Sequence, residues 1–201
     1  MTDLTPRDPA DVAHPFTQTL AVQLTGRQRL SVFLRPLYAI VSHIYVTFFL
    51  GLALAAAVFA WLIVLVTGRY PPAIYEFNVT AVRMTARHFS YLLITHDLAP
   101  PLHGDPDDSY PLRLELPPQR PQYDRRAVAL RPLRAIPVLF LAALTYVIGT
   151  LYAVLGTFVV LFTGQLPAYC AEPLRDAVAA VTRMCAYVLL TQDDPPALRA
   201  S

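Results

Sequence analysis

Residues 65–71 read LVTGRYP, and residues 161–167 read LFTGQLP. Each phrase ends a long apolar run without a charged residue, the first from Pro36 to Thr67 and the second from Ala135 to Thr163. Each run is longer than the roughly 20 residues that a helix needs to cross a bilayer. The two phrases therefore mark the ends of two predicted transmembrane helices.

The two phrases belong to a longer internal similarity. Shifting the sequence by 96 residues aligns 14–97 with 110–193 without a gap, and the identical residues include those of the phrase LRPL, at 34–37 and 130–133. A register held over this length predicts a tandem duplication. We therefore expect an N-terminal tail (1–13), a first membrane repeat (14–97), a linker (98–109), a second membrane repeat (110–193) and a C-terminal tail (194–201).

The shared phrase Thr-Gly-x-x-Pro predicts the end of each long helix. Gly68 and Gly164 are able to take the left-handed conformation that terminates a helix, and Pro71 and Pro167 prevent the helix from resuming.

Other residues predict where the long helices begin and how they meet the membrane. Pro36 and Pro132 suit a first helical turn, where the missing N–H costs nothing. Trp61 and Tyr70 are expected to anchor the first helix at the membrane surface.

Each repeat is expected to open with a short extended segment and to close with a second helix. The lead-ins HPFTQTLAV and YPLRLELPP alternate as short strands do. The second helix, predicted over 73–95, carries a polar stripe at helical spacing: Glu76, Thr80, Arg83, Arg87 and Ser90, with Glu172, Asp176 and Arg183 in the other repeat.

Two placements of this second helix are open. An amphipathic helix at the headgroup boundary would point its arginines toward lipid phosphates. A helix that crosses or dips into the membrane would bury its stripe against the other repeat.

Composition indicates that the protein lies in a lipid bilayer and argues against a nucleic-acid partner. The chain has 201 residues, of which 55% are apolar, with a mean hydropathy of +0.44. Its net charge of +2 is too small to predict a nucleic-acid partner.

Cys170 and Cys185 lie about 22 Å apart along one predicted helix, so they are expected to be apolar packing residues without a mutual disulfide.

Topology follows from the lead-ins and from the arginines. An even number of membrane crossings per repeat would keep both lead-ins on the same side. Arginines gather in the tails, the linker and the start of the second long helix, whereas Arg69 alone lies in the opposite turns. This bias predicts a multi-pass protein of the cell membrane with both termini in the cytoplasm.

The phrases LRPLYAI, VLVTGRYPPAIYEF, RHFSYLLITHD and YPLRLELP resemble the bacterial membrane family catalogued as domain of unknown function 4389. The resemblance covers both repeats. The second repeat departs from the family pattern with Gln165 and Leu166 where Arg and Tyr are usual. The resemblance implies an integral membrane protein and brings no reaction, cofactor or catalytic residue.

No catalytic constellation is recognisable in the sequence. The linker gathers metal-ligand types, His96, Asp97, His103, Asp105, Asp107 and Asp108, but their spacing matches no calcium loop. We expect an all-α membrane protein that is not an enzyme and that binds no cofactor and no metal.

The predicted function is that of a structural or accessory scaffold, which associates with the lipid bilayer and with other membrane proteins or itself. The alternative is a small transporter or channel component built from two repeats. The residues proposed for structural or interaction roles are Gly68, Pro71, Gly164, Pro167, Glu76, Arg83, Arg87, Glu172 and Arg183.

Overall fold

The computed structural model describes residues 16–101, 103–107 and 109–191. The elements follow one another as β1 (Thr17–Leu20), α1 (Arg29–Thr67), α2 (Pro72–Leu92), β2 (Leu112–Glu115), α3 (Arg125–Ala129), α4 (Arg131–Thr163), a 3-10 turn (Ala168–Cys170) and α5 (Ala171–Val188). The expected tails, 1–13 and 194–201, and the last two residues of the second repeat lie outside the described residues.

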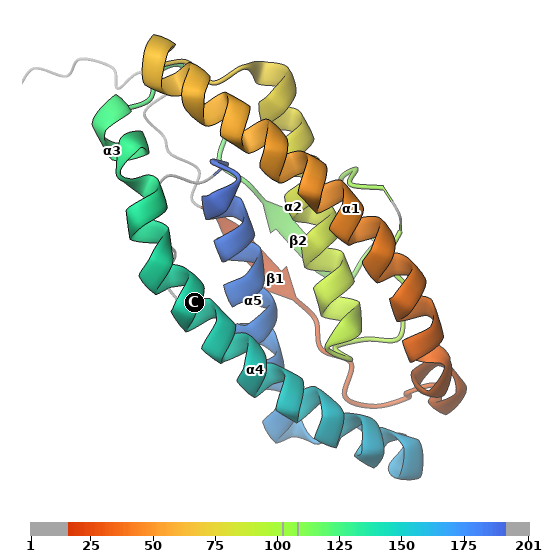
Figure 1. Ribbon diagram of the computed structural model, residues 1–201. Helices are drawn as coiled ribbons and strands as arrows, with labels where there is room; N and C mark the ends of the chain where they lie inside the picture. Colours follow the sequence, from red (N-terminus) through yellow and green to blue (C-terminus); the bar gives the residue numbers. More distant parts are fainter. Residues whose placement is uncertain (1–15, 102, 108, 192–201) are drawn as a thin grey trace, which may run out of the picture.

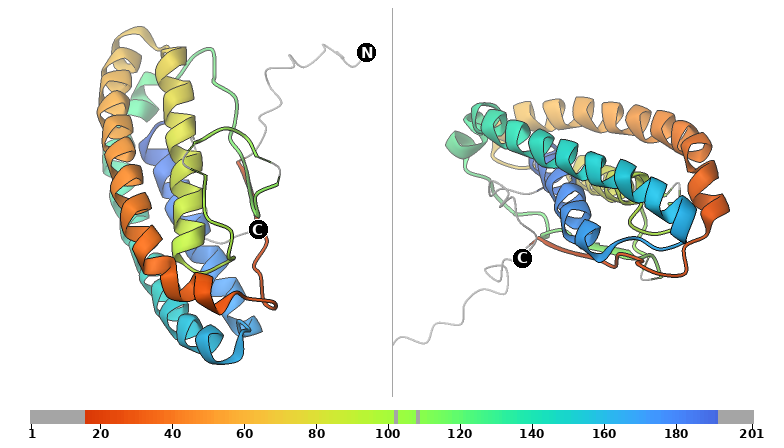
Figure 2. Two further views of the ribbon diagram at one scale, coloured as in Figure 1. Left: turned by 90° about the vertical axis from the view of Figure 1, so that its right-hand side faces the viewer. Right: turned by 90° about the horizontal axis from the view of Figure 1, so that it is seen from below.

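The elements form three layers (Figures 1 and 2). The two long helices, α1 and α4, make one outer layer; α2 and α5 make the middle layer, and the β1–β2 pair covers the side of α2 and α5 away from the long helices. Within the middle layer α2 and α5 run in opposite directions and pack against each other. The chain is therefore mostly helical, with a small strand pair on one face.

The long helices have the length and composition of membrane spans. Among the described helices, α1 has 39 residues and α4 has 33, and both are apolar enough to cross a membrane. Each buries only a narrow stripe, made mainly of small residues such as Ala53, Ala57 and Ala60 on α1 and Gly149 and Ala153 on α4. Most of the remaining surface of each helix is apolar and exposed, apart from polar residues such as Arg29 on α1 and Arg134 on α4.

Both long helices end at the glycines that the sequence indicates. Gly68 has φ +74° and Gly164 has φ +73°, and their N–H groups donate to the carbonyls of Val64 and Val160. This left-handed conformation is open to glycine without the steric cost that a Cβ would add. The predicted stop signals are confirmed.

Threonine hydroxyls complete both helix ends. Thr67 donates its hydroxyl to the carbonyl of Ile63 at 2.7 Å and accepts the N–H of Arg69 at 3.1 Å. Thr163 bonds in the same way to Val159 and to Gln165. Each hydroxyl thus satisfies backbone groups that the end of a helix leaves without partners.

Small residues let α5 approach α4 closely. A Cβ added at Gly149 would lie 2.2 Å from the Cβ of Ala177, so a methyl group at this position requires a shift of one helix. Such close backbone approach is typical of helix pairs in membranes, where small residues provide the packing.

The two lead-ins form an antiparallel pair. Thr17 faces Glu115 and Leu20 faces Leu112, so Gln18 faces Leu114, the residue 96 positions later. Thr17, Thr19, Arg113 and Glu115 are exposed, whereas the alternate residues point toward the helices. The predicted extended segments are confirmed as strands, and their pairing places both lead-ins on one side of the helices.

Three predictions about individual elements were wrong. Pro36 lies inside α1 rather than in its first turn, because the helix begins seven residues earlier, at Arg29. Tyr70 is 2% exposed and donates its hydroxyl to the carbonyl of Leu189, so it is a core residue and not a surface anchor. The second helix covers Pro72–Leu92 instead of 73–95, because the chain turns at Leu93.

Many contacts between the two halves occur in pairs related by the shift of 96 residues. Tyr123 donates its N–H to the carbonyl of Gly68 at 2.9 Å, and Arg27 donates its N–H to the carbonyl of Gly164 at 3.3 Å. Each half therefore supports the helix end of the other half with the corresponding residue of the segment that follows its own strand.

Candidate functional site: an arginine–aspartate cluster at the end of α2

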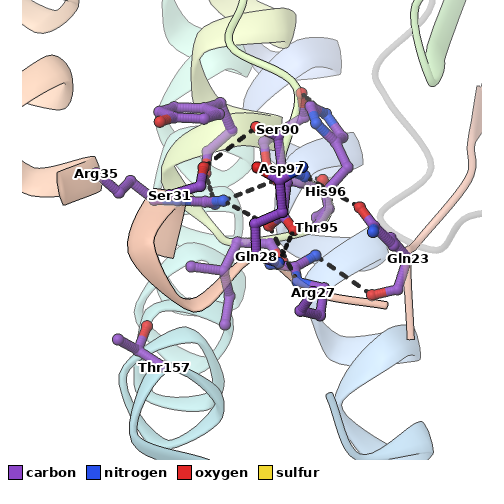
Figure 3. A network of polar contacts seen from close by, with 12 residues as sticks. Gln23, Arg27, Gln28, Ser31, Arg35, Ser90, Thr95, His96, Asp97 and Thr157 are labelled. Carbon is purple, nitrogen blue, oxygen red and sulfur yellow. Dashed lines mark hydrogen bonds and ion pairs between the residues drawn. The ribbon is translucent and has the colours of Figure 1, made fainter. Parts of the chain in front are cut away.

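The densest polar cluster that the structure describes surrounds Asp97, just beyond the C-terminus of α2 (Figure 3). One carboxylate oxygen of Asp97 lies 3.1 Å from Nε of Arg27 and 3.3 Å from Nη2 of Arg35. The other oxygen accepts the backbone N–H of Gln28 at 2.7 Å. Gln28 is the N-cap residue of α1 and makes no side-chain cap of its own, so Asp97 supplies the cap from 69 residues away.

The two arginines also donate to carbonyl groups at the end of α2 and in the turn that follows it. Arg35 donates to the carbonyls of Tyr91, at 2.5 Å, and His96, at 2.8 Å. Arg27 donates to the carbonyl of Ile94 at 2.8 Å. Cations near a helix C-terminus interact favourably with the helix dipole, so both guanidinium groups stabilise this end of α2.

The guanidinium groups of Arg27 and Arg35 are buried, and their surroundings act on their charge. Arg27 and Arg35 are 6% and 4% exposed. Burial lowers the pKa of Arg27, while the nearby Asp97 carboxylate acts in the opposite direction. The guanidinium of Arg35 lies 4.3 Å from the centroid of the Tyr91 ring, a cation–π contact that further stabilises its charge.

A strained turn holds the cluster in place. Ile94 has φ +52°, a left-handed conformation that is rare for a β-branched residue. Its side chain is 2% exposed and points toward α4, where a Cβ at Gly156 would lie 2.9 Å from Cδ1 of Ile94. The hydroxyl of Thr95 donates to the carbonyl of Ser90 at 2.7 Å and closes the turn.

The same turn recurs after α5. Leu190 has φ +63°, and the hydroxyl of Thr191 donates to the carbonyl of Ala186 at 3.0 Å. Arg131, which corresponds to Arg35, lies 4.9 Å from the centroid of the Tyr187 ring. The residue that corresponds to Asp97 is Asp193, which lies outside the described residues.

His96 occupies the inner side of the cluster. Its Nε2 lies 3.2 Å from the hydroxyl oxygen of Ser90, and its ring meets the Tyr110 ring edge-on at 5.0 Å. Burial, followed by the positive charges of Arg35 and Arg27, lowers the pKa of His96 to about 4. The imidazole is therefore neutral at pH 7.

Among the described residues, the structure separates the metal-ligand types of the linker; Asp108 lies outside the described residues. His96 is buried in the cluster, and Asp97 is committed to two arginines, whereas the side chains of His103 and Asp105 are exposed, 3.5 Å from each other. Among the described residues, no group of three such ligands is close enough to hold a metal ion.

The side chains of this cluster connect segments that are distant in the sequence. Asp97, Arg27 and Arg35 connect the end of α2 to the start of α1 and to the segment that leads from β1. The polar atoms of the cluster mostly meet one another or backbone carbonyls, so its chemistry is that of a structural clasp.

The Ser90 hydroxyl and the His96 imidazole form the hydroxyl–base pair of this cluster, but both residues are buried, at 0% and 2% exposed, and the hydroxyl donates to the carbonyl of Arg87 at 2.8 Å. This geometry is that of a satisfied core pair.

The glycines and prolines singled out in the sequence lie at two equivalent corners. A Cβ at Gly68 would lie 3.4 Å from Nε of Arg125, and a Cβ at Gly164 would lie 3.4 Å from Nε of Arg29. Pro71 is the N-cap residue of α2, and Pro167 precedes the 3-10 turn before α5.

The charged stripe of α2 divides into an exposed and a buried part. Glu76 is exposed at the start of the helix, and Arg83 is half-buried. Arg87 is 4% exposed and donates to the linker carbonyls of His103, at 3.1 Å, and Asp105, at 2.7 Å.

On α5 the corresponding residues behave similarly. Glu172 is exposed, whereas Arg183 is 9% exposed, with its guanidinium 5.8 Å from the centroid of the Phe16 ring. Arg87 and Arg183 thus both contact segments on the strand side of the helices.

A polar groove of about 350 Å³ lies between α2 and β2. Arg83, Arg87 and Asp107 line it together with residues 112–116. The stripe therefore faces the linker and the strands, on the side away from α1 and α4.

Sequence reasoning missed the clasp. It named Asp97 only as a potential metal ligand and did not single out Arg27, Gln28 or Arg35. A signal was present, because Arg35, Tyr91, Thr95 and Asp97 all recur after 96 residues. Recurrence alone does not reveal that these residues meet, since they are separated by the whole length of two helices.

Comparison with known proteins gives one match. A family described as domain of unknown function (DUF4389) matches residues 29–103, a segment that includes α1, α2 and the Asp97 turn. This match supports the family resemblance for the first half of the chain; the resemblance of the second half stays a prediction. No curated protein and no solved structure matches the chain.

Proposed function

We propose that this protein is a structural or accessory membrane protein without enzymatic activity, formed by two tandem copies of one unit that associate with lipid, with other membrane proteins or with themselves. The observation that carries the proposal is the apolar outer surface of α1 and α4. Bacterial origin and cytoplasmic termini remain predictions from the sequence. The multi-pass arrangement is also a prediction from the sequence, and the attachment to a single leaflet inferred below is the alternative to it.

The outer surface is too extensive for an ordinary water-facing layer. Of the described large apolar side chains that are exposed, all except Leu98, Leu130 and Tyr169 lie on α1 or α4. They include Phe48 (68% exposed), Phe140 (70%) and Phe162 (80%). Contiguous apolar surface of this size marks an interaction with a membrane or another protein.

The paired contacts support the tandem duplication. Corresponding residues bond to Gly68 and Gly164, corresponding turns follow α2 and α5, and Gln18 faces its own counterpart Leu114 in the strand pair. An approximate two-fold axis through the centre of the strand pair and between α2 and α5 would relate all these contacts. Two copies of one folding unit produce this arrangement without further assumptions.

The direction of the charged stripe favours the scaffold over the transporter. A transport path would place ionisable groups around a wet cavity between the membrane helices. Arg87 instead bonds to linker carbonyls, and Arg83 lines a groove next to β2. The stripe thus supports the packing of the linker and strands on the middle layer.

The test is membrane association followed by partner identification. We expect the protein to remain with membranes through an alkaline carbonate wash and to elute with lipid or partner proteins in mild detergent. The double variant Phe48→Arg/Phe140→Arg, on the outer surface, should weaken retention, whereas Thr17→Arg/Thr19→Arg, on the exposed face of β1, should not. A wild-type protein that stays in solution as a monomer without detergent would overturn the proposal.

A further inference from the structure

We propose that α1 and α4 lie in the plane of one leaflet, side by side, and do not cross the bilayer. The whole protein would then be attached to a single side of the membrane, with the strand pair facing water. This inference rests on the proposed membrane association, and it identifies the lipid leaflet as the occupant of the apolar outer surface.

The position of the strand pair is the first argument. Ala53 and Ala57, in the middle of the apolar run of α1, share a core cluster with Ala81 and Val82 of α2, and Leu114 of β2 packs against the same cluster. The strands therefore lie at the level of the middle of α1, on the opposite side of α2 (Figure 2).

This position is incompatible with a crossing helix. If α1 crossed the bilayer, the strand pair would lie at the depth of the hydrocarbon centre, where Arg113 and Glu115 are exposed. Charged side chains at that depth are strongly disfavoured unless they face protein or a water-filled cavity. The two-stranded sheet would also present unpaired backbone groups at its open edges, which hydrocarbon does not tolerate.

Helix length is the second argument. Exposed apolar side chains extend along α1 from Leu30 to Val66, nearly all of its 39 residues. At 1.5 Å per residue the helix is about 58 Å long, and fitting it within a hydrocarbon core of about 30 Å requires a tilt of about 60°. Observed tilts range from about 0 to 40°, so a helix in the membrane plane fits the exposed surface better.

The charges at the helix ends are the third argument. Arg29 begins α1, Arg69 follows its C-cap residue, and Arg134 lies in the first turn of α4; all three are exposed. In the proposed orientation they lie around the rim of one apolar surface, where long side chains reach the phosphates of the same leaflet. The surface itself carries no charge between Pro36 and Thr67 or between Ala135 and Thr163, as hydrocarbon requires.

The composition of the surface also favours lipid over a second copy of the chain. Protein interfaces combine an apolar centre with polar side chains that form hydrogen bonds across the contact. The outer surface of α1 presents Leu, Ile, Val and Phe from one end to the other, at positions such as Leu37, Ile44, Phe59 and Val66. The hydrocarbon of a lipid leaflet is apolar over its whole extent in the same way, so it matches this surface.

Membrane depth measured along α1 tests the orientation. Single cysteines replace Leu37, Ile44, Phe48, Phe59 and Val66, which share one face of the helix, in full-length protein carrying Cys170→Ala and Cys185→Ala. Each carries a spin label in vesicles of phosphatidylcholine and phosphatidylglycerol, and collision with oxygen or a water-soluble nickel chelate reports its depth. Thr19→Cys on β1 is the matched control.

The orientations predict different depth profiles. In the plane of the leaflet, all five α1 labels lie at similar depth, and the Thr19 label is accessible to the nickel chelate. A crossing helix would place Phe48 deepest, bring Leu37 and Val66 toward opposite surfaces, and bury the Thr19 label in hydrocarbon. That profile would overturn the inference and leave membrane association intact.

Sidedness gives an independent readout. Thr25→Cys and Arg69→Cys, at the two ends of α1, should both react with an impermeant thiol reagent added to one side of sealed vesicles, or both be protected. Reaction of one alone would show a crossing. Strong spin–spin broadening between labels on different molecules would show that a second copy of the chain covers the surface, and it would overturn the inference. Access of the nickel chelate to all five positions would overturn both the inference and the proposed function.

Discussion

The carboxylate of Asp97 accepts the N–H of Gln28 at 2.7 Å, so that a residue after α2 caps the start of α1. The same carboxylate neutralises Arg27 and Arg35, whose guanidinium groups in turn bond to carbonyls at the end of α2. One side chain thereby stabilises the end of one helix and the beginning of another. Asp97 lies in the segment that the family model matches, and the clasp gives this carboxylate a structural role.

Removing the charge of Asp97 should destabilise the fold. Asp97→Asn leaves two buried guanidinium groups without their counter-ion, and breaking a buried pair in this way costs about 3 kcal/mol or more. We expect a markedly lower midpoint in chemical unfolding in detergent. Asp105→Asn, whose side chain is 83% exposed in the linker, is the control and should change stability by less than about 0.5 kcal/mol. Equal stability of the two variants would contradict the clasp.

Replacing glycine by alanine should destabilise the protein at the two left-handed helix ends but not inside α1. Gly68→Ala and Gly164→Ala place a Cβ on a left-handed residue and should each cost about 1–2 kcal/mol. Gly51→Ala, inside α1 with open space around it, should instead be neutral or stabilising by up to about 1 kcal/mol. The measurement is thermal unfolding in detergent. A stabilising Gly68→Ala would show that the left-handed cap does not form.

The close contact between α4 and α5 should be sensitive to one methyl group. Gly149→Ala would bring its Cβ to 2.2 Å from the Cβ of Ala177, and such overpacking costs about 1–3 kcal/mol. Adding Ala177→Gly should recover part of the loss, because the second change restores the space. Additive effects of the two substitutions in a double-mutant cycle would show that the helices do not meet here.

His96 should contribute to acid sensitivity. Its pKa falls from an ordinary 6.5 to about 4 in the folded protein, so the folded state disfavours protonation. Stability from this group is complete above pH 6.5 and decreases as the pH falls toward 4, because the unfolded chain binds the proton first. The loss amounts to at most about 3 kcal/mol for a shift of this size.

The charged and titratable groups around His96 are Arg27, Arg35, Asp97 and Tyr110. His96→Gln keeps a polar side chain but removes the titration. The unfolding free energy of this variant should therefore vary less between pH 6.5 and 4 than that of the wild type. An unchanged pH dependence would assign the acid sensitivity to other groups, such as Asp97.

Sequence reasoning identified the features that depend on local chemistry. The apolar runs predicted the two long helices, because a long apolar segment in lipid must satisfy its backbone hydrogen bonds internally, and a helix does so within one segment. Gly68 and Gly164 predicted both helix ends, since a left-handed residue is a local requirement. Period-two alternation predicted the strands, although it did not say that they pair with each other.

Tertiary structure decided the features that depend on residues distant in the chain. Tyr70 has the amphipathic chemistry of a surface anchor, yet its hydroxyl meets Leu189, and only the packing of α5 against α2 makes that acceptor available. Asp97 looked like a linker carboxylate until the fold brought Arg27 and Arg35 to it. Hydropathy predicts which helices prefer lipid, but their direction in the membrane depends on where the charged strand pair lies, and that position is set by the packing of all three layers.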